Sequence, residues 1–398
     1  MAGPLSGIKV VELGVWVAGP SCAAILADWG AEVIKIEPPE GDPFRGLFAG
    51  LLGIAMNPPF ELDNRGKRSI ALNLEKEDAR YVAGDLIDDA DVFVTNMRPQ
   101  VLEKYGLTYE QLRDTNPKLI YCHVTGYGPD GPDANRAAYD VGAFYARGGV
   151  AAGLTAPGQE PPLQRGGMGD HMTGSNAAGA IAAALFHRER TGFGQKVAVS
   201  LLRTGVYMMG WDTNTALRGM PVNTFDRRHT PNPLINSYQD ANGNWFWLLL
   251  LQGDRHWPDV LRALDAGRLG EDPRFATLID RLQNTEAITA ELDSILATKT
   301  LAEWGPIFDR ENVWWAPVNT VAEVIEDPVA KTAGAFIEIP GPDGTPLRQV
   351  ATPVDFYGSP VEPTAWAPEL GQDTETILLE YGYDWDRISS LKELGAIP

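Results

Sequence analysis

An alternation of strand and helix near the N-terminus is the feature that most restricts the fold of this chain. Residues 8–13 form a short β-branched run, residues 21–29 have the composition of a helix closed by Gly30, and residues 32–37 form a second β-branched run. A strand, a helix and a strand at this spacing make a βαβ unit, which joins two parallel strands through a right-handed crossover. The sequence therefore predicts an α/β fold built on a parallel sheet.

The same alternation continues along the chain. We expect further strands at residues 69–74, 92–95, 119–125 and 195–201, and helices at residues 76–89, 101–105, 109–116 and 202–217. No GxGxxG motif follows the first strand, so a dinucleotide-binding domain is disfavoured. Residues 38–64 are rich in Pro and Gly yet apolar, which predicts an ordered loop over a ligand site.

The length and the changes in composition predict more than one domain. A chain of 398 residues is long enough for two or three domains at about 150 residues each. We expect a large domain at residues 1–217, a linker at 218–236 and a small domain at 237–324, with an intensely apolar strand at 245–251. The Pro-rich segment 325–398 is predicted to be extended and to return to the large domain through a helix at 371–381.

Charge and cysteine content exclude several classes of partner. The 33 basic and 53 acidic residues give a net charge of −20, which argues against nucleic acid and against an anionic membrane surface. The longest apolar runs are well short of about 20 residues, so no membrane span or signal peptide is expected. Cys22 and Cys122 fit reduced thiols in a cytoplasmic protein. No His and Cys set has metal-ligand spacing.

The most distinctive local feature is a glycine-rich turn that contains Gly166, Gly167 and Gly169 and is followed by Asp170. A small, apolar run at residues 175–190 comes next and predicts a buried helix. Asp170 would then lie at or just before a helix N-terminus, where the dipole and the free N–H groups favour the ionised carboxylate. This suits a nucleophile, but Asp170 as a simple helix cap is the alternative.

Polar and basic residues at strand ends are candidates for ligand binding. Asn96, Met97 and Arg98 follow the strand 92–95 directly, at the edge where open α/β sheets bind ligands. The basic cluster at residues 64–68 leads into the strand 69–74, and it is either a phosphate-binding group or a solvated turn. His123 alternates within the strand 119–125 and is expected to pack rather than to catalyse.

Taken together, the sequence motifs resemble those of the class III CoA-transferases, a family that also includes the α-methylacyl-CoA racemases. The resemblance extends from about residue 5 to residue 394 and is carried by the segments 5–13, 18–20, 26–37, 41–43 with Arg45, 64–69, 96–99, 124–128 and 192–202. In that family the Asp after the glycine turn is the catalytic carboxylate, a position that Asp170 occupies here.

The resemblance also implies an architecture and a substrate. It implies a Rossmann-like large domain built from both chain ends, a smaller α+β domain and an interlocked homodimer. It further implies no permanently bound cofactor, with a coenzyme A thioester as substrate. The positions that match CoA contacts of the family, or lie beside the reacting groups, are Val17, Ala18, Leu72, Asn73, Asn96, Met97, Arg98, Lys104 and Tyr139. Pro38 and Glu75 replace basic residues of some members, so Arg45, Arg65, Lys67 or Arg68 are expected to hold the phosphates instead.

Tyr139 separates the two branches of the family. Racemases carry a His there, because proton exchange beside a thioester needs a second base. Tyr, with a pKa of about 10, is a poor base near neutral pH. We therefore expect a transferase that moves CoA from an acyl-CoA donor to a carboxylic acid through aspartyl anhydride and aspartyl-CoA thioester intermediates on Asp170. A racemase with Tyr139 or His171 as second base, and a non-catalytic CoA-binding protein, are the alternatives.

Overall fold

The chain forms two compact units, described here separately. The computed structural model describes residues 3–47, 50, 53, 57–360 and 365–398. The larger unit contains Met1–Gly153, Pro162–Gly219 and Ala333–Pro398, and the smaller unit contains Leu154–Pro161 and Met220–Thr332. The smaller unit therefore takes up most of the stretch 218–236 that was expected to be a linker.

A six-stranded sheet forms the centre of the larger unit, and all its neighbouring strands pair in parallel. The strand order is β3-β2-β1-β4-β5-β6, the doubly wound order in which the direction of winding reverses between β1 and β4. The predicted α/β class is confirmed, and each predicted strand overlaps an observed one. The strands are β1 (Lys9–Leu13), β2 (Glu32–Glu37), β3 (Lys67–Ala71), β4 (Val92–Thr95), β5 (Ile120–Thr125) and β6 (Gln195–Ser200).

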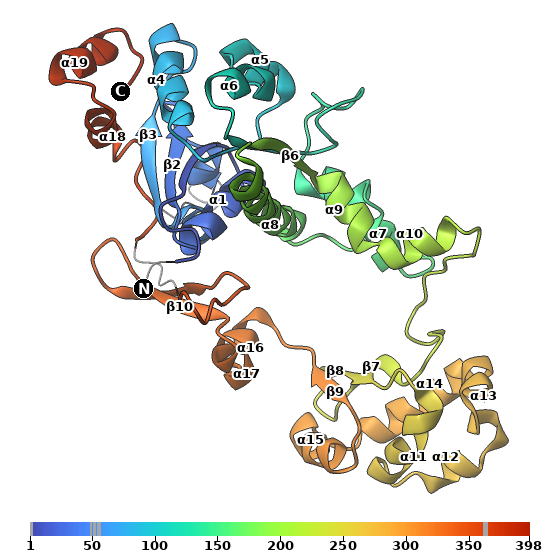
Figure 1. Cartoon of the computed structure of the whole chain (residues 1–398). Coiled ribbons are helices and arrows are strands. Elements are labelled where there is room, and N and C mark those ends of the chain that lie inside the picture. The colour runs from blue at the N-terminus through green and yellow to red at the C-terminus, as the bar shows by residue number, and fades with distance from the viewer. Residues whose placement is uncertain (1–2, 48–49, 51–52, 54–56, 361–364) are drawn as a thin grey trace. The chain divides into compact units, whose positions relative to one another are not determined.

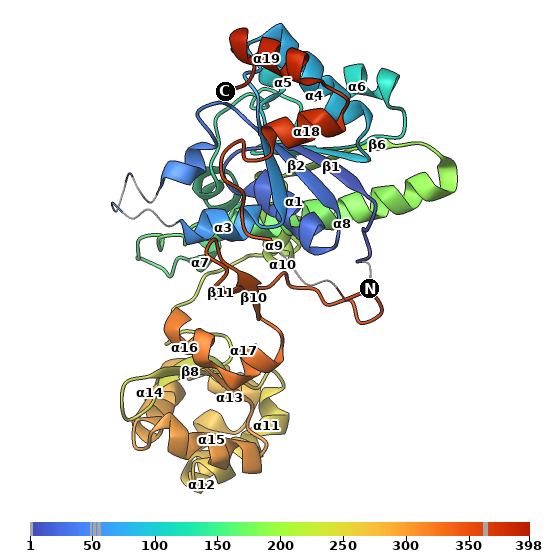
Figure 2. The ribbon, with the colours of Figure 1, turned by 90° about the vertical axis from the view of Figure 1, so that its left-hand side faces the viewer.

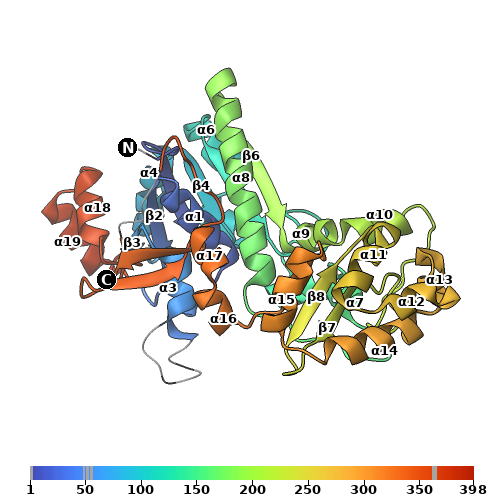
Figure 3. The same ribbon diagram turned by 90° about the horizontal axis from the view of Figure 1, so that it is seen from below.

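Helices cover both faces of the sheet because successive strand residues point to opposite sides. Val10 belongs to the apolar cluster under α1 (Ala18–Asp28) and α8 (Met168–Thr191), which lie side by side in Figure 3. Its neighbour Val11 belongs to the cluster on the other face. The helices of that second face are α4 (Glu77–Asp88), α5 (Pro99–Tyr105), α6 (Tyr109–Thr115), α18 (Thr374–Glu380) and α19 (Trp385–Glu393).

The end of the chain is attached to the edge strand β3. The backbones of Ser69 and Asp373 are joined by a hydrogen bond of 2.9 Å, and the Asn73 N–H donates to the Ala396 carbonyl at 2.9 Å. Figures 1 and 2 show α18 and α19, in red, beside β3 and α4. A two-stranded hairpin, β10 (Phe336–Pro340) and β11 (Pro346–Val350), precedes these helices.

Two expectations for the larger unit need correction. Residues 58–64 are not loop but the helix α3 (Pro58–Asn64), since the Asn57 side chain caps it and Pro58 suits its first turn. Residues 48–49, 51–52 and 54–56 of the predicted loop lie outside the described residues. The predicted helix 202–217 is two helices, α9 (Leu201–Met208) and α10 (Gly210–Ala216). The remaining elements before α8 are the short turn η1 (Pro43–Gly46), the π-helical turn η2 (Val141–Ala146) and α7 (Val150–Leu154).

The smaller unit is a three-stranded antiparallel sheet packed against helices, coloured yellow to orange in Figure 1. Its strands are β7 (Ile235–Gln239), β8 (Trp245–Leu249) and β9 (Trp315–Pro317). Its helices are α11 (Gly253–Ala263), α12 (Gly267–Glu271), η3 (Pro273–Phe275), α13 (Leu278–Gln283), α14 (Thr285–Leu296), α15 (Leu301–Arg310), α16 (Val321–Glu326) and α17 (Pro328–Thr332). The buried Trp304 and Phe308 rings stack at the centre of its core.

Within the part of the chain that the structure describes, no helix combines the length and the apolar character that crossing a membrane requires.

Candidate active site

A cavity of about 320 Å³ opens in the larger unit at the point where the strand order reverses. Segments that follow β1, β4 and β5 line it, and so do residues 134–140 and the first turn of α8. Doubly wound sheets bind ligands at this place, because the loops on either side of the reversal separate. Asp170 lies in its wall, so the structure brings the predicted nucleophile to the predicted ligand edge.

Asp170 lies in the first turn of α8, which begins at Met168 rather than near residue 175. Gly167 occupies the N-cap position with a φ of +76°, a conformation that favours glycine, and no side chain caps the helix from there. Asp170 is thus the third residue of the helix and not its cap. The simple-cap alternative is wrong for this residue.

The helix terminus is satisfied by a different carboxylate, Asp140, which the sequence analysis did not single out. Asp140 Oδ2 accepts the N–H of Gly169 at 3.0 Å and that of Asp170 at 3.4 Å. Its other oxygen accepts from Gln164 Nε2 at 2.6 Å. Asp140 directly follows Tyr139, but nothing in its sequence neighbourhood indicates a partner about thirty residues later.

The surroundings of Asp170 favour its neutral form more than the sequence suggested. Burial of the side chain and the charges of Asp140 and Asp63 together raise its pKa to about 7, against the opposing effect of His171. Burial thus outweighs the effect of the helix terminus on Asp170, and the N–H groups of Gly169 and Asp170 donate to Asp140. Near pH 7 both forms of Asp170 are populated.

His171 points to another partner. Its Nε2 lies 3.0 Å from Oδ1 of the buried Asp63, and this carboxylate raises the pKa of the imidazole against the effect of burial. His171 lines a separate cavity of about 270 Å³ together with Asp63. Tyr139, by contrast, lines the same cavity as Asp170 and has 62% of its surface exposed.

The predicted binding residues divide into two groups. Five of them line the cavity with Asp170: Ala18, Asn96, Met97, Arg98 and Tyr139. The others lie outside its wall: Val17, Arg45, Arg65, Leu72, Asn73 and Lys104. Among these, the Leu72 side chain is fully buried in the core and Asn73 Nδ2 donates to the Gly395 carbonyl at 3.1 Å. Val17 is the N-cap of α1, directly beside Ala18.

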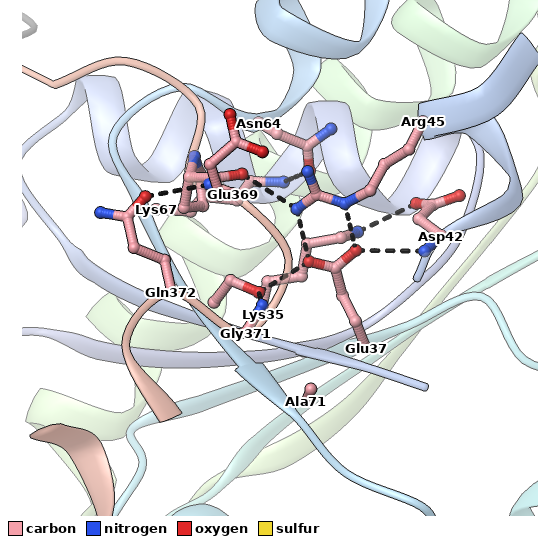
Figure 4. A network of polar contacts seen from close by, with 12 residues as sticks. Lys35, Glu37, Asp42, Arg45, Asn64, Lys67, Ala71, Glu369, Gly371 and Gln372 are labelled. Carbon is pink, nitrogen blue, oxygen red and sulfur yellow. Dashed lines mark hydrogen bonds and ion pairs between the residues drawn. The ribbon is translucent and has the colours of Figure 1, made fainter. Parts of the chain in front are cut away.

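The basic residues proposed as phosphate contacts are engaged by carboxylates. Arg45 makes a two-point contact with Glu37 at 2.7 and 2.8 Å, shown in Figure 4. Arg65 is 1% exposed and is paired with Asp28 at 2.5 Å, and buried Lys67 lies 2.6 Å from Glu12. The exposed pairs Arg68–Glu380 and Lys104–Glu75 complete this set.

Arg98 differs from these residues. It is exposed at the cavity, and within the described residues no carboxylate or hydrogen-bond partner is recorded for its guanidinium. Arg136 also lines the cavity, and its nearest carboxylate oxygen, on Asp133, is 3.6 Å away. Arg98 and Arg136 are therefore the cations that the cavity offers to an anionic ligand.

His123 packs as expected. It is buried in β5, and its Nε2 lies 2.9 Å from the carbonyl oxygen of Met97, so it supports the loop that carries Met97 and Arg98. Burial lowers the pKa of this imidazole, which favours its neutral form. In the described part of the chain, no group of three or more His, Cys, Asp and Glu side chains is arranged to hold a metal ion.

Known proteins are similar to this chain in both sequence and fold. The family described as CoA-transferase family III matches residues 5–374. The chain is 34% identical to an (R)-2-hydroxy-4-methylpentanoate CoA-transferase of Clostridioides difficile, over 98% of both proteins. It is 33% identical to a cinnamoyl-CoA:phenyllactate CoA-transferase of Clostridium sporogenes, over 98% of this chain and 96% of that protein.

A solved structure gives the same result. A CAIB/BAIF family protein from Brucella suis superposes with a TM-score of 0.84 at 33% identity, covering 96% of this chain and all of that one. The parallel six-stranded sheet, the carboxylate in the cavity at its switch point and the sequence matches agree. The chain belongs to CoA-transferase family III.

Proposed function

We propose that this transferase works by covalent catalysis on Asp170, which accepts the acyl group of an acyl-CoA and then CoA itself. The observation that carries the proposal is the place of Asp170: a carboxylate in the wall of the cavity at the switch point, with the exposed cation of Arg98 lining the same cavity. A carboxylate nucleophile of this kind divides one difficult transfer into easier steps.

Each step exchanges one acyl bond for another. The Asp170 carboxylate attacks the thioester carbon of the donor, the C–S bond breaks, and a mixed anhydride and CoA thiolate result. The thiolate attacks the Asp170 carbonyl carbon, which releases the donor acid and leaves an aspartyl-CoA thioester. The acceptor carboxylate then displaces the thiolate to form a second anhydride. The thiolate finally attacks the new acyl carbon, which yields the product acyl-CoA and free Asp170.

Trapping of the aspartyl intermediates tests this proposal. The enzyme is mixed with acyl-CoA and treated with hydroxylamine or borohydride, and peptides are analysed by mass spectrometry. A modification at Asp170 in the wild type, absent in Asp170→Asn, is the expected result. An Asp170→Asn protein that folds, binds CoA and turns over at the wild-type rate would show that the nucleophile is elsewhere.

The racemase alternative needs a second base at the same cavity. His171 lies with Asp63 at a separate cavity, which leaves Tyr139 of the two side chains considered, and a phenol is a poor base near neutral pH. Incubation with a 2-methylacyl-CoA in deuterated water separates the two reactions. Exchange at the α-carbon without an acceptor acid would overturn the transferase assignment.

We further infer the assembly and the placement of CoA. The larger unit acts as the CoA-binding domain, and Arg98 supplies a phosphate contact. Two such chains form a homodimer, because α9 and α10 carry exposed apolar side chains, among them Tyr207 at 86% and Trp211 at 92% exposed, that a second copy would cover. Free, buried Cys22 and Cys122 support a reducing compartment such as the cytoplasm.

A further inference from the structure

Trp16 has an unusual backbone for a bulky residue. Its φ is +65°, and the other non-glycine residues with positive φ in the described ranges are Asp265 and Asn312. Asp and Asn tolerate this left-handed region, whereas a large side chain there is a strained exception. Such strain persists only where the surroundings enforce it, and it gathers at functional sites.

Three side chains enforce the conformation. Asp42 Oδ1 accepts the Trp16 N–H at 3.1 Å. Asn96 holds both backbone groups of Val15, accepting its N–H at 3.0 Å and donating to its carbonyl at 2.7 Å. The buried Lys35 Nζ donates to the Gly14 carbonyl at 2.9 Å and to Asp42 Oδ2 at 3.1 Å, as part of the network in Figure 4.

These hydrogen bonds hold the Trp16 ring at the wall of the cavity that contains Asp170. Trp16 and Tyr139 both line this cavity, and their rings meet edge to face with centroids 5.5 Å apart and planes at 90°. Behind Trp16 lies buried Phe44 at 6.0 Å, and Phe44 is followed by buried Phe60 at 6.3 Å. Four rings thus run from the core to the cavity, and the last, Tyr139, is mostly exposed.

A half-buried Trp16 and a mostly exposed Tyr139 that line the same cavity as Asp170 are suited to bind a substrate ring. Aromatic side chains bind other rings in offset or edge-to-face contacts beyond simple apolar burial. A small acid such as acetate has no ring to pack against this surface, so a strained Trp at position 16 offers it no contact of this kind. Gly or Asn at position 16 would adopt the same backbone without strain.

We propose that Trp16 and Tyr139 bind the acyl portion of an arylalkanoic acid, and that Trp16 determines the preference of the enzyme for such acids. The proposal rests on the proposed covalent function of Asp170. It assigns the two rings to binding and no chemical step to either.

Hydroxylamine-driven release of CoA measures the preference without a second acid. Wild-type enzyme is given 3-phenylpropanoyl-CoA or acetyl-CoA with hydroxylamine, and kcat/KM is measured for each. We expect the wild type to favour the aryl substrate by at least about 10-fold. In Trp16→Asn the ratio of the two values falls by about 10- to 100-fold, with the loss confined to the aryl substrate. Trp16→Phe retains most of the preference.

Matched variants keep the result interpretable. Tyr139→Ala, at a residue 62% exposed, lowers the same ratio even if Trp16→Asn does not fold, and Trp385→Ala, on α19, leaves it unchanged. Equal losses for both substrates in Trp16→Asn and Tyr139→Ala, or a wild type that prefers acetyl-CoA, would overturn this inference alone. Absence of Asp170-dependent CoA release with either thioester would overturn the covalent function and this inference together.

Discussion

Two carboxylates at the start of α8 have different surroundings and different tasks. Asp140 accepts two backbone N–H groups and the Gln164 amide, while Asp170 projects into the cavity. Burial and the charge of Asp140 together hold the pKa of Asp170 at about 7. A pair of carboxyl groups whose environments differ in this way often has divided roles in catalysis. In the proposed mechanism Asp140 is thus a positioning residue that also raises the pKa of Asp170.

The pH profile of the enzyme reports this adjustment. Because the proposed mechanism requires Asp170 to attack as the carboxylate, kcat/KM should rise with pH through a midpoint near 7 in the wild type. Asp140→Asn keeps an oxygen for the Gly169 N–H but removes the charge, so the midpoint moves to lower pH. Asp89→Asn, which alters a remote pair with Lys9, serves as control and leaves the midpoint in place. An unmoved midpoint in Asp140→Asn would contradict the electrostatic role.

The same raised pKa predicts a cost in stability. An Asp with a folded pKa of about 7 and an unfolded value near 3.8 binds its proton more tightly in the folded state, so stability declines as pH rises from about 4 to about 7. An Asn side chain cannot ionise, so the Asp170→Asn protein does not lose stability in this way over this pH range. Its Tm should match the wild type near pH 4, exceed it increasingly up to pH 7, and stay above it at higher pH. Differential scanning calorimetry checks this, and a Tm gap independent of pH would refute it.

At the scale of elements, the glycines before α8 show where the sequence was informative and where it was misleading. The spacing of Gly166, Gly167 and Gly169 predicts one turn before the helix, yet the helix begins at Met168, so Gly169, like Gly174, lies within it. Of the three, Gly167 alone has a positive φ. A Cβ on Gly169 would collide with Phe144 and Asp140, and one on Gly174 with Ser21 of α1. Glycine is required at both positions because α8 packs closely against its neighbours. The residues that it packs against are far away in the sequence.

Elements defined by local pattern were predictable, and contacts across the chain were not. The β-branched runs located all six strands of the large sheet, and Asn96, Met97 and Arg98 line the cavity beyond these strands. The cap by Asp140 and the strained Trp16 depend on partners 26 to 81 positions apart, which no periodicity reveals. The carboxylate partners of Arg65 and Arg68 are also distant, whereas Glu37 lies only eight positions before Arg45.

The packing of α8 on α1 can be tested with two glycines of the same helix. In Gly174→Ala the new Cβ meets Ser21 and lies 3.0 Å from the Ala18 carbonyl oxygen, so overpacking should lower the free energy of unfolding by about 1–3 kcal/mol. Gly179→Ala has no atom within 4 Å of its Cβ and should stabilise by up to about 1 kcal/mol. Thermal unfolding of both variants measures this difference in stability. A Gly174→Ala protein as stable as Gly179→Ala would contradict the close packing.

At the scale of the whole molecule, the exposed apolar side chains of α9 and α10 are the basis for the proposed homodimer. Among the described residues of α10 none is buried, and Trp211 is almost fully exposed. A patch of this kind is covered in stable proteins by a partner. Light scattering should give twice the chain mass for the wild type, and Trp211→Glu should shift the protein toward the chain mass because a charge is then buried at the interface.

The control for this experiment is Trp385→Glu, at an exposed residue outside the face. It should leave the mass of the wild type unchanged. A wild type that has the mass of a single chain at micromolar concentration would exclude the proposed homodimer. A dimer that survives Trp211→Glu would place the interface on another surface.

The hydrogen bonds between β3 and the C-terminal segment have a consequence for biosynthesis. Ser69 and Asp373 are 304 positions apart, so the ribosome finishes the edge strand long before the segment that covers it. At about 5–20 residues per second, β3 waits roughly 15–60 s with its outer edge unpaired. During translation the nascent chain must therefore shield this strand from other nascent chains, and the demand on chaperones should depend on elongation speed over residues 72–372.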